Sequence, residues 1–109
     1  MAQLDVHRNK GALRESIAFV VLVQSAQFDR YRRRVVVPLV LQTLLPRDTP
    51  TAGARMNPVF VVDGIRVVLH PLDMVSVALN QLGEMVGSLA QEGHIIADAL
   101  DELLTRSWG

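Results

Sequence analysis

The residues best suited to chemistry form one basic cluster, in which Arg30, Arg32, Arg33 and Arg34 surround Tyr31. On an extended strand, residues 30, 32 and 34 share one face and residues 31 and 33 the other, because side chains alternate. A ribonuclease of small-barrel type would use such a patch to bind backbone phosphate. Alternatively, the charges protect an exposed strand edge from pairing with another strand. The second interpretation is favoured, since a phosphate-binding surface normally draws on several segments.

Other chemistry-bearing residues lack the spacing that catalysis or metal binding requires. His7, His70 and His94 form no pair at metal-ligand spacing. The serines lack nucleophile-elbow glycines, and no glycine-rich phosphate loop precedes a helix. The sequence contains no cysteine, which excludes a disulfide, a thiol nucleophile and a zinc–thiolate site. We therefore expect no catalytic residue, no metal and no cofactor.

The single tryptophan, Trp108, lies four residues after Leu104 and is followed only by Gly109. A large aromatic side chain at a chain end either folds back onto its own domain or contacts a partner. Tryptophan is among the residue types most enriched at interface hot spots, where truncation costs about 2 kcal/mol or more. Without further information, folding back is the somewhat favoured alternative.

Length and charge limit the protein class. The chain has 109 residues, 50% apolar and 20% charged, which is typical of one globular domain. Residues 1–55 hold 9 basic and 4 acidic residues, a net charge of +5, whereas the remainder holds 2 and 7, a net charge of −5. The overall charge of zero excludes binding of nucleic acid by bulk charge, although a local basic patch stays possible.

The N-terminal residues and the apolar runs predict a soluble cytoplasmic protein that does not associate with membranes. The first ten residues include charges and no apolar core of signal-peptide length. No apolar run approaches the ~20 residues of a membrane helix. The apolar fraction is nevertheless high for a small domain, which suggests a buried interface between copies of the chain.

The elements that must position these residues are mostly strands. Residues 4–7 alternate as in a half-buried strand, and residues 17–23 (IAFVVLV) fit a strand buried on both faces. Residues 34–41 repeat this pattern, with Pro38 indicating an edge or a bulge. Residues 46–55 read as a surface loop. Asp63-Gly64 between two β-rich runs predicts a tight type I′ hairpin.

The last third is helical by its pattern. Apolar residues recur at helical spacing from about 75 to 89. Gly83 and Gly87 weaken this prediction, because each glycine destabilises a helix by ~1 kcal/mol relative to alanine. Ser88 and Gln91 have capping-box spacing, which predicts a helix start there. A helix is therefore expected over about residues 89–106, with its acidic residues on the side opposite its apolar stripe.

Several short segments in a fixed order are together similar to one known family. They are QLDV (3–6), VQS (23–25) followed by Asp29, RRVVVPL (33–39), NPV (57–59), LDMVSV (72–77), LGE (82–84) with Val86 and Leu89, and the final Trp108-Gly109. This set spans essentially the whole length and resembles the CcdB family, the toxins of plasmid-type toxin–antitoxin pairs that poison DNA gyrase.

The resemblance implies a mainly β fold with a C-terminal α-helix, an SH3-like antiparallel β-barrel of the kind shared by the CcdB and MazF toxins. It implies a single domain over residues 1–109, with the barrel at about 1–82 and the helix at about 89–106, assembled as a homodimer. It also implies that residues 75–79 form a strand, against the local helical pattern.

The resemblance further implies a function in plasmid maintenance that is not enzymatic. Such a toxin binds gyrase A, a component of DNA gyrase, and traps the complex of gyrase with cleaved DNA, without binding nucleic acid on its own. The gyrase-binding residues carried over are Ser107, Trp108, Gly109, Gln27 and Phe28. An acidic, partly disordered CcdA-like antitoxin would neutralise the toxin by contacting Arg33, Phe28 and Trp108.

Two alternatives stay open. The first is a ribonuclease toxin on the related barrel that cuts mRNA, for which the cluster from Arg30 to Arg34 is the motive. The second is a relative that binds an antitoxin without poisoning anything, because the family's Trp-Gly is followed by a final isoleucine that this sequence lacks.

Overall fold

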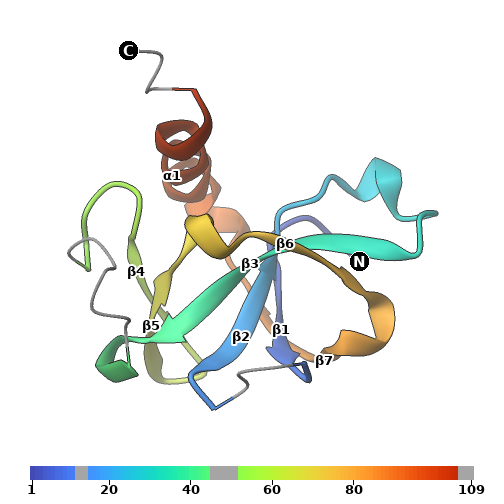
Figure 1. The fold of residues 1–109 in the computed structure, drawn as a ribbon, viewed down its shortest axis with the longest axis horizontal. Coiled ribbons are helices and arrows are strands. Elements are labelled where there is room, and N and C mark those ends of the chain that lie inside the picture. Colours follow the sequence, from blue (N-terminus) through green and yellow to red (C-terminus); the bar gives the residue numbers. More distant parts are fainter. Residues whose placement is uncertain (12–14, 45–51, 106–109) are drawn as a thin grey trace.

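One antiparallel sheet curls beneath a C-terminal helix in the computed structural model, which describes residues 1–11, 15–44 and 52–105 (Figure 1). The sheet has the order β4-β5-β3-β2-β1-β7, and β6 pairs with β3. The elements are β1 (Asp5–Asn9), β2 (Ile17–Leu22), β3 (Arg33–Leu41), β4 (Val59–Val62), β5 (Ile65–Leu69), β6 (Val75–Ala78), β7 (Leu82–Ser88) and α1 (Gly93–Leu104). The predicted mainly β fold with a C-terminal helix is confirmed. None of the described helices is long and apolar enough to cross a membrane.

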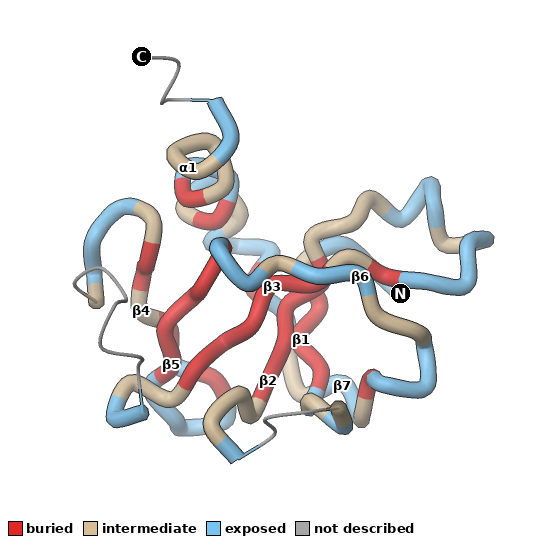
Figure 2. The backbone as a smooth tube through the Cα atoms, viewed as in Figure 1, coloured by how far each residue is buried: buried red, intermediate tan, exposed pale blue. Residues whose placement is uncertain are grey.

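Strand β2 lies at the centre of the sheet and is buried on both faces, as its sequence predicts (Figure 2). Phe19 and Val21 join the main core cluster, which α1 completes with Ile96 and Ala99. Val20 and Leu22 belong to a second cluster together with Val36 and Leu82, among others. The side chains of β2 alternate between the two faces, so one strand supplies both apolar layers.

Proline at position 38 does not mark an edge strand, so that part of the prediction is wrong, although the pairing of β3 with β2 is irregular just after it, between Leu39 and Val40. Pro38 is buried in the middle of β3 and lies opposite Val20 of β2. Along the edge of β3 that faces away from β2, the strand pairs with β6 up to Val36 and with β5 from Leu39 onward. The Pro38 carbonyl accepts a hydrogen bond from the amide of His70, which lies between those two partners. The missing amide proton of Pro38 therefore falls where β3 changes partner and no ladder bond is required.

The hairpin between β4 and β5 is confirmed. Asp63 and Gly64 both have positive φ, 52° and 76°, as a type I′ turn requires. Arg8 of β1 binds this turn through Asp63 (3.1 Å) and binds β7 through Glu84 (2.9 Å). Hydrogen bonds to Glu84 and Asp63 raise the pKa of the Arg8 guanidinium above its ordinary value.

Strand β1 is not half-buried as its alternation predicts. Asp5 and His7 are buried together with Val6. Irregular pairing between β1 and β7 on either side of His7 lets the sheet bend over this face, and the His7 ring nitrogen Nδ1 lies 3.0 Å from the Gly83 carbonyl. The Asp5 carboxylate accepts a hydrogen bond from the Ala2 amide at 2.9 Å. Local alternation cannot indicate the burial of His7, because its ring contacts the backbone of Gly83, which lies far along the chain.

The helix that the periodicity predicts over residues 75–89 is wrong, because this segment forms β6 and β7. The strand that the family resemblance implies is confirmed as β6. Gly83, which weakened the helical prediction, lets β7 approach β1 closely: a Cβ atom there would lie 3.0 Å from the Arg8 carbonyl on β1. The sheet continues through β7 to Ser88, beyond the expected limit near residue 82. The Ser88 hydroxyl accepts a hydrogen bond from the Ala90 amide at the start of the turn η5 (Ala90–Glu92). Helix α1 begins only at Gly93.

Replacing Gly64 with alanine tests the hairpin geometry. Space is available for the added Cβ, but its positive φ is strained for alanine, so Gly64→Ala should lower the free energy of unfolding by about 1 kcal/mol in urea titrations. Gly87→Ala is the matched control, since its Cβ is equally unobstructed and its φ is not positive. Equal stability of the two variants would contradict the proposed turn geometry.

Candidate functional site

The segment between β2 and β3 projects from the sheet on the same side as α1 (Figure 1). We refer to residues 23–32 as the β2–β3 loop. It contains one 3-10 turn, η1 (Ala26–Phe28), and Ser25 caps the N-terminus of this turn. The Ser25 hydroxyl accepts a hydrogen bond from the Gln27 amide at 3.4 Å. The loop includes two of the predicted site residues, Gln27 and Phe28.

A buried arginine holds this loop in shape. The Arg34 side chain is 5% exposed and donates to the carbonyls of Tyr31, Arg33 (2.9 Å) and Asp29 (2.7 Å). Its guanidinium also forms an ion pair with the Asp29 carboxylate at 3.6 Å. The planar guanidinium has five donors, so it can bind several carbonyls of one turn at once. Arg34 is therefore a structural residue. The prediction that residues 30, 32 and 34 share one face of an extended strand is wrong, because β3 begins only at Arg33. The favoured interpretation as an exposed strand edge is wrong as well, since residues 30 and 32 lie in the loop and Arg33 pairs with β6.

A second set of hydrogen bonds closes the base of the loop. The Gln24 amide group donates to the carbonyls of Phe28 (3.2 Å) and Arg33 (3.4 Å), and its oxygen accepts from the Val35 amide (3.1 Å). The N-terminal ammonium of Met1 forms an ion pair with Asp29 at 3.2 Å. The loop is thus fixed both to the sheet and to the N-terminal segment.

The braced loop presents an aromatic pair to solvent. Phe28 is 44% exposed and Tyr31 55% exposed, with ring centroids 6.2 Å apart and planes inclined by 41°. The Arg30 guanidinium lies 5.7 Å from the Tyr31 ring centroid, within the range of a cation–π contact. Gln27 is exposed as well. The predicted contact residues Gln27 and Phe28 are therefore accessible on a preorganised loop.

Arg33, the predicted antitoxin contact, is exposed at the start of β3. Its guanidinium donates to the Ser76 hydroxyl (2.9 Å) and carbonyl (2.7 Å) on β6. Both partners are neutral, so the positive charge of Arg33 is not compensated by these bonds. Together with Arg30 and Arg32, it gives this end of the sheet a positive surface.

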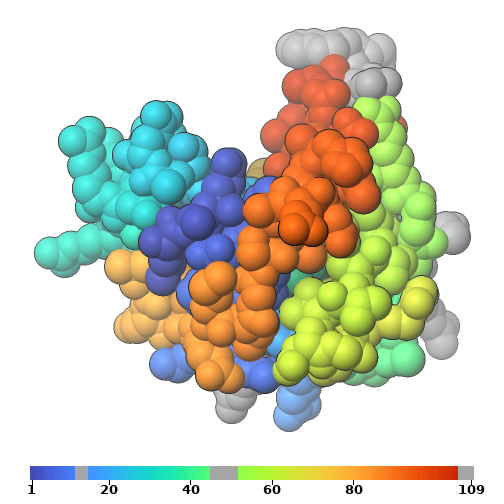
Figure 3. Space-filling model, turned by 180° about the vertical axis from the view of Figure 1, so that it is seen from behind, coloured from blue at the N-terminus to red at the C-terminus, as the bar shows by residue number. Residues whose placement is uncertain are grey.

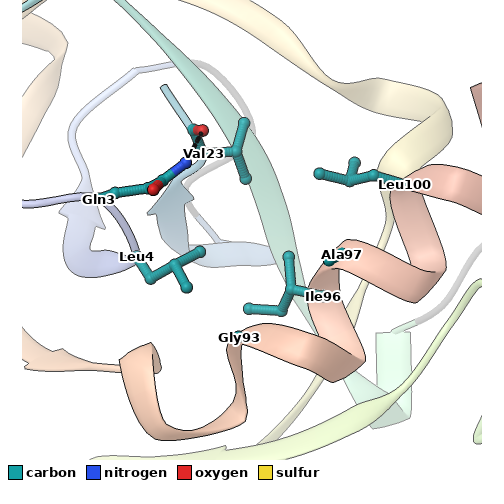
Figure 4. Close-up of a pocket in the computed structure, with 7 residues that line it drawn as sticks. All are labelled: Gln3, Leu4, Val23, Gly93, Ile96, Ala97 and Leu100. Atoms are coloured by element: carbon teal, nitrogen blue, oxygen red, sulfur yellow. Dashed lines mark hydrogen bonds between the residues drawn. The ribbon is translucent and has the colours of Figure 1, made fainter. Parts of the chain in front are cut away.

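A pocket of about 290 Å³ opens between the helix and the start of the chain (Figure 4). Its lining residues are uncharged: Gln3, Leu4, Val23, Gly93, Ile96, Ala97 and Leu100. The Gln3 side chain donates to the Val23 carbonyl at 3.0 Å. In the space-filling view, the N-terminal segment lies between α1 and the β2–β3 loop, and both of these extend further toward the top of the view than it does (Figure 3). We refer to the pocket together with the exposed faces of α1 and this loop as the helix–loop cleft.

Two acids of helix α1, Asp98 and Glu102, are turned away from the pocket. Arg55 forms ion pairs with Asp98 (3.7 Å) and Glu102 (3.2 Å). At 100° per residue, those two acids lie on the side of the helix opposite Gly93, Ala97 and Leu100. Leu104 continues the uncharged stripe at the end of α1 and is 61% exposed. Sequence reasoning treated the acids as a solvated face and overlooked this uncharged stripe, whose spacing of 93, 97, 100 and 104 could have revealed it.

Three predicted gyrase contacts, Ser107, Trp108 and Gly109, lie outside the described residues. The structure therefore brings Phe28 and Gln27 together on one loop, but it does not place them relative to Trp108. Leu104, the last residue of α1, lies four residues before Trp108 in the sequence.

The histidines do not converge on an active site. His7 and His70 are both buried, and His70 lies 3.0 Å from the Asp73 carboxylate, whereas His94 is exposed on α1. In the part of the chain that the structure describes, no three His, Asp or Glu side chains gather to hold a metal ion. The chemistry offered by the helix–loop cleft is that of a binding surface, with apolar, aromatic and cationic groups.

Comparison with known proteins gives a family and a fold. The family model described as CcdB protein matches residues 3–106. An endoribonuclease solved in complex with its cognate antitoxin, from Mycobacterial species, is 15% identical with a TM-score of 0.73, covering 100% of this chain and 99% of that chain. The Mycobacterium tuberculosis toxin MazF-mt6 is 14% identical with a TM-score of 0.72, covering 95% and 99%. No curated protein matches in sequence. At such identities, the two structures show the fold alone.

Arg34→Lys tests the brace of the β2–β3 loop. One ammonium group cannot reproduce the bonds to three carbonyls, so we expect a loss of about 2 kcal/mol in the free energy of unfolding and faster hydrogen exchange in the loop. Arg32→Lys is the matched control: Arg32 is exposed, and its replacement should change stability by less than about 0.5 kcal/mol. Unchanged exchange in Arg34→Lys would show that the loop does not depend on this residue.

Proposed function

The chain belongs to the CcdB family, and we propose that it is the toxin of a type II toxin–antitoxin module that acts on DNA gyrase. The match to the family over residues 3–106 carries this proposal. The toxin would bind gyrase A in the state that holds cleaved DNA. Preferential binding of one state shifts the population toward that state, so the toxin needs no catalytic group of its own.

The helix–loop cleft supports this function because it offers a preorganised apolar surface. Phe28 and Gln27 would contact gyrase from the β2–β3 loop, and Ser107, Trp108 and Gly109 would contact it from the end of the chain. The hydrogen bonds of Arg34 and Gln24 fix the loop before binding. A fixed loop loses less conformational entropy on association, so more of the contact energy contributes to affinity.

An acidic CcdA-like antitoxin would neutralise the toxin in the cytoplasm, and plasmid maintenance is the expected biological role. The cations of Arg30, Arg32 and Arg33 support an acidic partner, and Phe28 and Trp108 would add apolar contacts. The antitoxin would then use residues that gyrase also needs, and the two partners would compete.

A ribonuclease is the second candidate function. It is favoured by the exposed Arg33 and by the fold shared with an endoribonuclease. Incubation of the pure protein with RNA separates the two candidates. Cleavage that survives Trp108→Ala but is lost in Arg32→Ala or Arg33→Ala would support the ribonuclease. Binding of an antitoxin without growth arrest, RNA cleavage or gyrase binding would instead indicate a non-poisoning relative.

We also propose that the toxin is a homodimer. The segment of η3 (Pro71–Asp73), β6 and η4 (Leu79–Gln81) exposes Leu72, Val75 and Leu79. Apolar side chains on an accessible sheet margin favour association, and a second copy would cover them.

The gyrase proposal is tested by capture of purified gyrase A on the immobilised toxin. Trp108→Ala should weaken binding by about 2 kcal/mol, roughly thirtyfold, and Phe28→Ala by about tenfold, because both remove buried aromatic contacts. Val61→Ala is the control, since Val61 is also an exposed apolar residue but lies on β4. Equal capture by wild type, Phe28→Ala and Trp108→Ala would contradict the assigned surface.

The dimer is tested by light scattering on the purified protein. The chain has a mass of 12.0 kDa, so a dimer should have twice that mass. Val75→Asp places a charge in the proposed interface and should give a monomer, whereas Val61→Asp on β4 should leave the dimer intact. A wild-type monomer at micromolar concentration would contradict the assembly.

A further inference from the structure

We propose that the pocket in the helix–loop cleft is the anchor site for one large apolar side chain of an acidic peptide segment. This inference rests on the proposed function, in which that segment belongs to the antitoxin. It goes further by assigning the residues that select the segment and the chemistry that they select.

The lining of the pocket determines what enters it. The buried Ile96 belongs to the main core cluster, and Leu4, Val23 and Leu100 pack against the same cluster. No lining residue carries a charge that could pair with a buried ion. A charged group in the pocket would therefore lose its hydration without gaining an ion pair. The volume of about 290 Å³ is just below the usual range of small-molecule pockets, ~300–1000 Å³. One leucine-sized or phenylalanine-sized side chain is the occupant that fits.

The backbone at the pocket is strained. Leu4 has a φ of 71°, a left-handed conformation that is unfavourable for a bulky residue. Two backbone hydrogen bonds maintain it, from the Leu4 amide to the Leu22 carbonyl (2.6 Å) and from the Leu89 amide to the Leu4 carbonyl (2.9 Å). Leu4 also packs closely on α1, since a Cβ at Gly93 would lie 3.0 Å from its side chain. Strain of this kind clusters at functional sites.

The charges around the pocket select an acidic segment. The acids Asp98 and Glu102 are turned away and paired with Arg55. Asp101, one helical turn after Ala97, accepts a hydrogen bond from the Thr105 hydroxyl. On the β2–β3 loop, Asp29 is already engaged by the Met1 ammonium and Arg34. The exposed arginines 30, 32 and 33 have no acidic partner among the ion pairs that the described residues form. A segment that fills the pocket and continues along the loop therefore meets positive charge, which favours aspartate and glutamate.

Selection of short random peptides on the immobilised wild-type protein tests the proposal without gyrase or an identified antitoxin. We expect the enriched peptides to combine several acidic residues with one large apolar residue. Ala97→Arg should then weaken their binding by about tenfold or more, because the new side chain obstructs the pocket. Ala54→Arg is the control: it adds the same charge at another exposed alanine that does not line the pocket.

The added arginine separates shape from charge, because a positive charge alone would strengthen binding of an acidic peptide. Ala97→Met obstructs the pocket without charge and should also weaken binding. Replacing both Arg30 and Arg32 with glutamine should weaken binding several-fold at low salt and have little effect at high salt. Circular dichroism confirms that each variant is folded.

Three results would overturn the proposal: no peptide is enriched, the enriched peptides are neutral or basic, or their binding is unaffected by Ala97→Arg and Ala97→Met. Capture of gyrase A by the same variants keeps this outcome separate from the proposed function. If no acidic peptide is enriched while Ala97→Arg abolishes gyrase binding, the pocket belongs to the gyrase contact. Enrichment of acidic peptides by a protein that does not bind gyrase would support the anchor site and contradict the gyrase function.

Discussion

The guanidinium of Arg34 lies buried under residues 29–33, and its bonds to backbone carbonyls determine what the β2–β3 loop can present. A buried cation needs hydrogen-bond acceptors and an opposite charge, and Arg34 has three carbonyls and the Asp29 carboxylate. The carbonyls of Asp29, Tyr31 and Arg33 therefore point inward, and the side chains of Tyr31, Arg32 and Arg33 are left exposed. Gln24 fixes Phe28 and Val35 in the same way. The aromatic pair and the cations of the candidate site are thus consequences of one internal hydrogen-bond network.

Part of the charge of the protein is divided between two separate surfaces. Positive charge collects at the exposed end of β3 and on the loop before it, whereas Asp98 and Glu102 of α1 face Arg55 on the side of the helix opposite the pocket. The stripe between these surfaces is uncharged and ends at the exposed Leu104. This arrangement would suit the proposed toxin with two partners: the cations would attract an acidic regulator, and the apolar stripe would provide contact area that does not depend on charge.

The sequence predicts elements whose determinants are local. The run of β2 and the Asp63-Gly64 turn are confirmed because burial and positive φ are encoded in adjacent residues. Strand β6 is predicted by the family resemblance alone, since its local pattern is helical, and the structure confirms it. Predictions fail where distant segments decide. Arg34 binds carbonyls of a loop that the alternation treats as strand, and Pro38 falls at a change of strand partner that no local pattern shows. The pocket is likewise formed by residues near positions 4, 23 and 97, which only the fold brings together.

The central claim is that this member of the CcdB family acts by trapping gyrase through the helix–loop cleft and the end of the chain. The most direct measurement is a DNA cleavage assay with purified gyrase, supercoiled plasmid and the toxin, followed by denaturation and proteolysis. The account predicts linear DNA that depends on gyrase and on Trp108, while RNA added to the same mixture stays intact. Cleavage of the RNA with no linear DNA would contradict it and assign the activity to a ribonuclease.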